Sequence, residues 1–155
     1  TQIIKLAASM GLDIPILGSD TLDSNKVLEA AAGSDVQLYV STFYQEGGSP
    51  EFDEGFKAWL SEDSTAMTNN GGNDTIAAVT AMGYDAYYVA LEALKAAGST
   101  DAGAVKAALP GVTYTGVTGV IAFDDIGDAI RDTAYIKVAD TANSAWALET
   151  MQKAG

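Results

Sequence analysis

The sequence predicts an α/β fold with a mixed, mainly parallel sheet and flanking helices. Two observations predict it. Near the start, a short apolar strand at residues 14–17 precedes a helix at 24–32 and an alternating strand at 36–42, which is the order of a βαβ unit. From residue 117 onward the chain reads as strands separated by a hairpin turn.

The first part of the chain has a clear signal for each element. Gly11 ends the first helix, and Gly18 lets the chain turn after the first strand. Asp23 or Ser24 provides the N-cap of the next helix. The first helix, over residues 1–10, is predicted by an apolar stripe at helical spacing: Ile3, Ile4, Ala7 and Met10.

Ser49 and Pro50 open a helix over residues 50–62, with Ser49 as N-cap and Pro50 in the first turn. Residues 61–73 are polar and turn-prone, so we expect a long irregular segment there, and such segments are often functional.

A helix of about two dozen residues is expected to follow, from Asp74 or Thr75 to Ala97, where Gly98 stops it. A short helix begins at Thr100 or Asp101 and is terminated by Pro110. The residues of one cluster at helical spacing are predicted to be mostly packing residues: Tyr84, Asp85, Tyr87 and Tyr88. Strands are predicted at 117–123, 133–138 and 145–149.

Residues 124–128 (DDIGD) join two of these strands and admit two interpretations. Calcium binding is one, but the segment lacks the alternating acids and the distal glutamate of a calcium loop. A hairpin turn with Gly127 at positive φ is therefore favoured.

Composition excludes several classes of function. The net charge of −13, with one arginine and seven lysines, argues against nucleic acid and anionic membranes as partners. Without histidine the chain lacks the usual general base and the commonest transition-metal ligand. Without cysteine it has no disulfide, thiol nucleophile or thiolate metal site. We therefore predict no catalytic residues, no metal and no cofactor.

Asp20 is the first candidate for a functional residue. It follows the strand at 14–17 and Gly18, and ligands of open α/β sheets bind at the carboxyl ends of the strands. A cation or an ammonium group could meet its carboxylate there. The alternative is an acid that caps the backbone amides of the next helix. Ser19 and Thr21 are supporting candidates for ligand contact, whereas Asp23 reads more simply as a cap.

Four segments, in order, carry a resemblance to a known family: residues 12–20 (LDIPILGSD), 81–86 (AMGYDA), 97–101 (AGSTD) and 116–128 (GVTGVIAFDDIGD). In them the chain resembles the C-terminal part of the type I periplasmic solute-binding proteins of ABC importers, in particular the leucine/isoleucine/valine-binding branch. The ordered set covers nearly the whole chain, which makes it more specific than any one segment.

The resemblance implies two α/β lobes that flank a cleft. It assigns residues 1–42 to the second lobe, 43–131 to the first lobe and 132–155 to the second lobe again. It also implies that most of the first lobe's sheet is missing from this chain. Three helices would then expose apolar faces, and we expect the missing half or another copy of the chain to cover them: 50–62, 75–97 and 101–109.

The resemblance also implies roles for the site residues. An acid at the position of Asp20 takes the α-ammonium of a bound amino acid. Phe43 and Tyr44 lie at a crossing between lobes, where an aromatic ring walls the pocket or simply packs in the core. For Asn73 and Asp74 the resemblance gives no residue-by-residue match. The segment 69–74 before the long helix could cradle a ligand through its backbone amides, and the favoured alternative is a flexible loop with an N-cap. The Gly/Asn-rich surroundings of these two residues depart from the usual family pattern.

The function that the resemblance implies is that of an extracytoplasmic substrate-binding component of an ABC transporter. It would bind a small amino acid, branched-chain by this reading, through closure of the lobes, and the permease would recognise the closed state. The protein would not be an enzyme. The alternatives are a ligand-sensing ectodomain of a receptor or regulator, a carboxylate-based enzyme and a constitutive interaction module.

Overall fold

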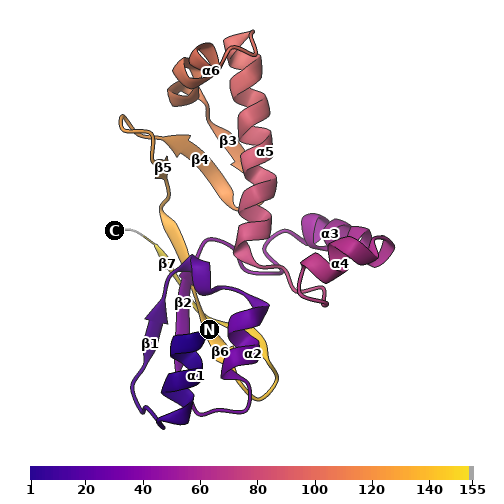
Figure 1. The fold of residues 1–155 in the computed structure, drawn as a ribbon. Coiled ribbons are helices and arrows are strands. Elements are labelled where there is room, and N and C mark those ends of the chain that lie inside the picture. The colour runs from indigo at the N-terminus through magenta and orange to yellow at the C-terminus, as the bar shows by residue number, and fades with distance from the viewer. Residues whose placement is uncertain (154–155) are drawn as a thin grey trace.

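The computed structural model describes residues 1–153, which form two parts that each contain a sheet (Figure 1). In Figure 1 the lower part holds a four-stranded sheet with helices α1 (Gln2–Ser9) and α2 (Asn25–Ala31). The upper part holds a three-stranded sheet beside the long helix α5 (Ala78–Ala97). Helices α3 (Pro50–Glu62) and α4 (Ser64–Asn69) lie to the side, at the junction of the two parts.

The lower sheet has the strand order β1-β2-β6-β7. Its first two strands are parallel and joined through α2, so the predicted βαβ unit and the mixed α/β sheet are confirmed. The expectation of mainly parallel pairing is wrong for the described strands, because β2–β6 and β6–β7 are antiparallel. β2 leads the chain out of the lower part and β6 brings it back, so the two run in opposite directions. The bounds are β1 (Ile16–Gly18), β2 (Leu38–Thr42), β6 (Thr133–Asp140) and β7 (Ala145–Lys153).

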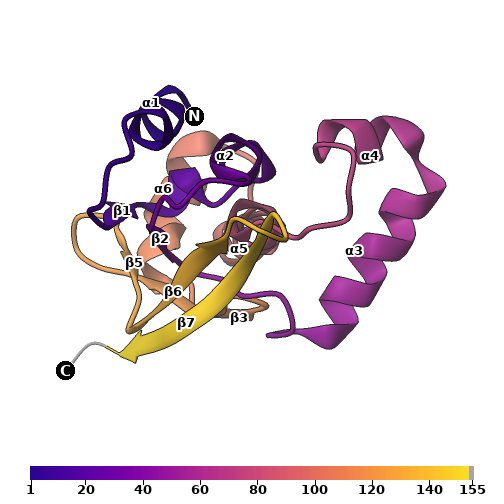
Figure 2. The same cartoon turned by 90° about the horizontal axis from the view of Figure 1, so that it is seen from below.

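The core of the lower part lies between this sheet and the pair α1 and α2, which lie together on one side of it (Figure 2). Val27, Leu28 and Leu38 are buried there. The stripe predicted for the first helix is buried only in part: Ile4 and Ala7 face the core, whereas Ile3 and Met10 are exposed.

The upper part packs α5 against α6 (Ala102–Ala108) and an antiparallel sheet of order β3-β4-β5. Gly98 ends α5 with a φ of 59°, as predicted. β4 (Gly119–Phe123) confirms the predicted strand, whereas β3 (Tyr114–Gly116) was not predicted. β5 (Ala129–Ile130) follows a turn in which Gly127 has a φ of 94°, which confirms the turn interpretation. The turn pairs β4 with β5, however, and not with the predicted strand at 133–138, which lies in the lower sheet.

Two helix boundaries at the junction differ from expectation. The segment 61–73 is not irregular throughout, since α4 forms within it and Asp63 caps the helix by accepting from the amides of Thr65 and Ala66. The long helix begins at Ala78 and not at Asp74 or Thr75. Pro50 does open α3, but the Ser49 side chain makes no capping bond.

The structure leaves large apolar side chains exposed on two of the three helices for which this was expected. Val79 and Tyr87 of α5 are 65% and 61% exposed, and Trp59 of α3 is 52% exposed. On α6 the expectation is wrong, because Val105 packs against the upper core and Leu109, just after the helix, does the same.

Candidate functional site

The turn that follows β1 carries the first group of predicted site residues. Gly18 ends the strand, and a Cβ at this position would collide with the side chain of Leu22, which folds back over it. Residues Asp20–Leu22 then form a single 3-10 turn, in which the amide of Leu22 donates to the carbonyl of Ser19 at 3.0 Å. The glycine therefore permits the tight return that places Asp20 at the carboxyl end of the strand.

Asp20 is half-buried, and its carboxylate accepts no hydrogen bond from residues 1–153. The capping role weighed for it is therefore not realised by its side chain. Beside it, the hydroxyls of Ser19 and Thr21 are 2.9 Å apart and share a hydrogen bond at the exposed surface. The turn thus presents one carboxylate and two hydroxyls, a set that suits a cationic or polar ligand group.

Asp23 has a larger role than the cap that the sequence indicated. Its side chain is buried, and its Oδ2 atom lies 3.0 Å from Nζ of Lys137 on β6. The same oxygen accepts from Oγ1 of Thr42 and from the backbone amide of Ala78, both at 3.1 Å. The N-cap position of α2 belongs instead to Ser24. An acid next to a helix start gives no hint of a lysine 114 positions away, so the sequence could not show this pair.

Phe43 lies at the end of β2, half-buried, with the guanidinium of Arg131 over its ring at 5.4 Å from the centroid. Arg131 also donates from Nη1 to the carbonyl and the hydroxyl of Thr118, at 3.0 and 2.9 Å. The two residues come from the two places where the chain passes between the lower and upper parts. This cation–π contact therefore joins the two connections.

Tyr44 is buried, which confirms the packing alternative for this residue. Its hydroxyl donates to Oδ1 of Asp53 at 2.6 Å and accepts from the amide of Ser49 at 3.1 Å. Burial, followed by the bond to Asp53 and the charge of that carboxylate, raises the pKa of Tyr44 well above its ordinary value. These bonds hold the chain just after β2, where it leaves the lower part, to the start of α3.

Asn73 and Asp74 lie in the loop between α4 and α5, away from the helix start for which they were considered. Oδ1 of Asn73 accepts from the side chain of Asn25 at 2.7 Å and from the amide of Thr75 at 3.0 Å. Asp74 lies 3.7 Å from Nζ of Lys57, a surface pair of little energetic weight. Asn73 therefore ties this loop to the start of α2, and no described hydrogen bond joins the loop to Asp20 or Phe43.

Asp85 is the second buried acid whose role differs from the sequence reading. It is fully buried in α5 and accepts from the amides of Val117 and Thr118 at 2.8 Å each. The hydroxyl of Thr118 adds a third bond at 2.6 Å. The neighbouring tyrosines contact one another with tilted and edge-on rings, but Tyr84 and Tyr87 are exposed, so the prediction of core packing holds only in part.

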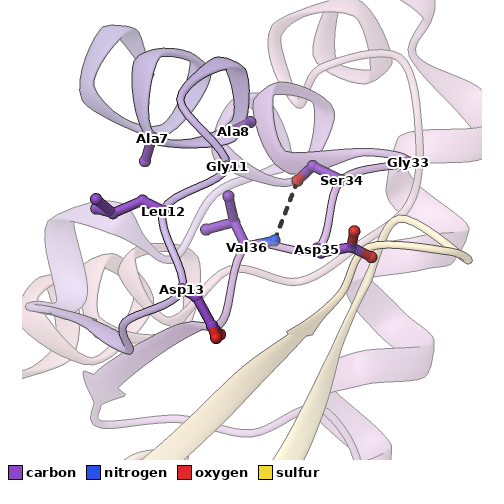
Figure 3. A pocket seen from close by; sticks show the side chains of 9 residues that line it. All are labelled: Ala7, Ala8, Gly11, Leu12, Asp13, Gly33, Ser34, Asp35 and Val36. Carbon is purple, nitrogen blue, oxygen red and sulfur yellow. Dashed lines mark hydrogen bonds between the residues drawn. The ribbon is translucent and has the colours of Figure 1, made fainter.

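Two hollows in the surface lie away from Asp20. One, of about 540 Å³, is formed by the loops before β1 and β2 (Figure 3). It is at the amino ends of these strands, opposite to the edge at which α/β proteins bind ligands. The other, of about 590 Å³, is an aromatic groove between α3 and α5. Its lining includes Phe52, Phe56, Trp59 and Tyr84.

Within residues 1–153 no cluster of three or more acids could hold a metal ion. In the same range no helix is long and apolar enough to cross a membrane.

Comparison with known proteins finds periplasmic and solute-binding proteins both by sequence and by structure. A family model described as a periplasmic binding protein matches residues 1–143. The leucine binding protein LivK from Thermotoga maritima is 25% identical, with a TM-score of 0.71 over 97% of this chain and 41% of that one. LivJ from Streptococcus pneumoniae, solved with isoleucine, is 21% identical, with a TM-score of 0.65 over 98% of this chain and 40% of that one.

A solute-binding protein of an ABC transporter from R. palustris, solved with benzoate, is 17% identical, with a TM-score of 0.71. It is matched over 99% of this chain and 40% of its own. No curated protein matches the sequence. The chain thus spans about two fifths of the length of these solved structures.

Proposed function

Because this chain belongs to the periplasmic binding protein family, we propose that it forms part of the extracytoplasmic substrate-binding component of an ABC importer. The proposed ligand is a small amino acid, of the branched-chain type. The protein acts by binding alone, and its partners are the ligand and the permease subunits that receive it.

Asp20 carries the proposal. Its carboxylate stands at the carboxyl end of β1, half-buried, with its oxygens unused by the described residues. An α-ammonium group would supply the missing donors in a charge-assisted hydrogen bond, which is among the stronger polar contacts. Ser19 and Thr21 would extend this contact through their hydroxyls. These roles follow from the placement of the turn and from the family likeness.

The charge of the site favours an amino acid over an aromatic acid such as the benzoate in one of the similar structures. A carboxylic acid without an ammonium group would bring a second negative charge to Asp20, in a chain of net charge −13. Like charges brought together in a site oppose binding. An amino acid instead presents a cation to Asp20 and leaves its carboxylate for donors elsewhere.

Phe43, Asn73 and Asp74 are proposed to complete the ligand surface from the other side of the cleft. Phe43 is held in place by Arg131 and would pack against an aliphatic side chain. The Oδ1 atom of Asn73 accepts from Asn25 and Thr75, whereas its amide hydrogens have no acceptor among residues 1–153 and could donate to a carboxylate. The Asp74 carboxylate would add a hydrogen-bond acceptor, besides Asp20, at the edge of the cleft.

The mechanism proposed is closure of two lobes on the ligand. Residues 1–42 and 132–155 would belong to one lobe and 43–131 to the other, with residues 154 and 155 outside the described part of the chain. The connections after β2 and before β6 would bend as the lobes close. The missing half of the protein, or a second copy, would cover the apolar faces of α3 and α5.

A thermal-shift panel on the full-length protein tests this function. The panel contains leucine, isoleucine, valine, a polar amino acid, an acidic amino acid and benzoate, since a ligand that binds only the folded state raises the melting temperature. The proposal predicts a rise with one or more of the aliphatic amino acids and none with benzoate. A rise with benzoate alone would contradict the assigned ligand class, and no rise with any member would contradict amino-acid binding.

A further inference from the structure

The carboxylate of Asp23 connects three separate segments through one oxygen atom. Oδ2 accepts from Thr42 Oγ1 at 3.1 Å, from the amide of Ala78 at 3.1 Å and from Lys137 Nζ at 3.0 Å. Asp23 and Lys137 are each only 2% exposed. The other carboxylate oxygen of Asp23, Oδ1, is buried and accepts no hydrogen bond from residues 1–153, so the described partners of this carboxylate all contact Oδ2.

Two of these segments belong to the lower sheet and the third belongs to the upper part. Thr42 is the last residue of β2, from which the chain leaves the lower part. Lys137 lies on β6, along which the chain returns. Ala78 is the first residue of α5, the long helix of the upper part. Two neighbouring strands of the lower sheet and the helix of the upper part therefore meet at one buried carboxylate.

Asp23 also supplies the cap that α5 lacks in its own sequence. The N-cap position is Ala77, which has no side chain that could accept a hydrogen bond. The first amides of a helix have no partner within it, and its N-terminus favours a negative charge. The Asp23 carboxylate, 55 positions earlier in the chain, meets both requirements. The start of α5 at Ala78 coincides with this contact.

The same residue closes the turn that presents Asp20. The amide of Asp23 donates to the carbonyl of Asp20 at 3.0 Å, and Asp23 is the C-cap residue of the 3-10 turn Asp20–Leu22. The backbone of this turn is therefore fixed at one end by the contacts of the Asp23 side chain. A displacement of α5 or of β6 relative to the turn would act on Asp20 through Asp23.

We propose that Asp23 is a positioning residue that fixes the Asp20 turn to the N-terminus of α5 and to β6, and so couples ligand contact at Asp20 to the relative placement of the two lobes. The predicted effect on ligand binding rests on the proposed function. The anchoring of the Asp20 turn to α5 and β6 rests only on the contacts of Asp23.

The variants must avoid an unpaired buried charge, which by itself destabilises a protein strongly. Asp23→Ala with Lys137→Met removes the ion pair together with the acceptor for Ala78. Asp23→Asn with Lys137→Met removes the charges but restores a side-chain oxygen at the same place. Asp85→Asn is the matched control, because Asp85 is equally buried and also accepts three hydrogen bonds, but in the upper part.

Hydrogen exchange of the full-length protein without ligand is the first readout. In the Ala/Met variant the hydrogen-bonded amides of Leu22, Asp23 and Ala78 are expected to exchange about tenfold faster or more, because their anchoring is lost. The Asn/Met variant should recover most of the protection. Asp85→Asn should lower the unfolding temperature but leave exchange at Leu22 and Asp23 unchanged. Wild-type exchange at Leu22 and Asp23 in the Ala/Met variant would overturn the proposal.

Calorimetry with leucine, isoleucine and valine is the second readout. The Ala/Met variant should bind at least about tenfold more weakly than wild type although Asp20 is intact, and the Asn/Met variant should regain most of the affinity. Unchanged affinity in the Ala/Met variant would overturn the coupling to ligand. If the wild-type protein binds none of these amino acids but exchange follows the prediction, the coupling stands and the proposed ligand is wrong.

Discussion

The carboxylate of Asp85 occupies the space that a side chain at position 116 would need. A Cβ on Gly116 would collide with three atoms of the Asp85 carboxylate, whose oxygens accept from the amides of Val117 and Thr118. The aspartate of α5 and the glycine that ends β3 are thus a matched pair. Together they fix the turn between β3 and β4, to which Arg131 then binds through Thr118.

Gly116→Ala should therefore destabilise the protein by about 2 kcal/mol or more, because either the turn or the buried carboxylate must move. The measurement is denaturant unfolding of the full-length protein. Gly111→Ala is the matched control, since a Cβ there meets no atom within 4 Å. Equal stability of the two variants would refute the tight fit between Asp85 and Gly116.

Tyr44→Phe should cost about 1–3 kcal/mol at neutral pH, since it leaves Asp53 and the amide of Ser49 without their shared partner. The cost should shrink above about pH 10. There the tyrosine ionises in the unfolded chain, while its raised pKa keeps it protonated in the fold. This part of the stability is complete below the ordinary tyrosine pKa and declines as pH rises towards the folded value.

Unfolding of wild type and Tyr44→Phe between neutral and alkaline pH measures this difference. Tyr39→Phe serves as the control, because the hydroxyl of Tyr39 makes no hydrogen bond with residues 1–153. A stability difference between wild type and Tyr44→Phe that stays constant up to strongly alkaline pH would contradict the assigned environment of Tyr44.

The 155-residue chain by itself should self-associate through the apolar faces of α3 and α5. Light scattering is expected to give a mass above the 16.0 kDa of one chain. Replacing Val79 and Tyr87 with serine should shift the mass towards one chain, because these side chains are among the most exposed apolar groups of α5. Replacing Ile126, an exposed residue in the β4–β5 turn, with serine should leave the mass unchanged. A single-chain mass for the wild type would refute this prediction.

The βαβ unit could be predicted from the sequence because its signals are local. An apolar strand, the glycine at position 18, a capped helix and an alternating strand follow one another within residues 14–42. Gly98 and Gly127 likewise mark their turns within a few residues. In the same way, placing Asp20 at the end of a strand needed only neighbouring residues.

The features that the sequence did not predict depend on contacts between residues that are far apart in the chain. The start of α5 coincides with its contact to Asp23, which lies in another element, and helix signals at Asp74 and Thr75 were misleading. The pair of Asp23 with Lys137 and the bond of Asp85 to Thr118 join positions 114 and 33 residues apart. No local pattern distinguishes such acids from ordinary surface carboxylates. The antiparallel pairing of β2 and β6 has the same origin in tertiary structure.

The most direct test of the account is calorimetric titration of the full-length protein and its Asp20→Ala variant with leucine, isoleucine and valine. Each amino acid is paired with its analogue that lacks the α-ammonium group. We predict that wild type binds at least one of these amino acids, that the paired analogue binds weakly, and that Asp20→Ala loses about 10- to 100-fold in affinity. Binding that is equally tight in Asp20→Ala, or equally tight for the analogue, would contradict the assignment of Asp20 as the ammonium-binding residue.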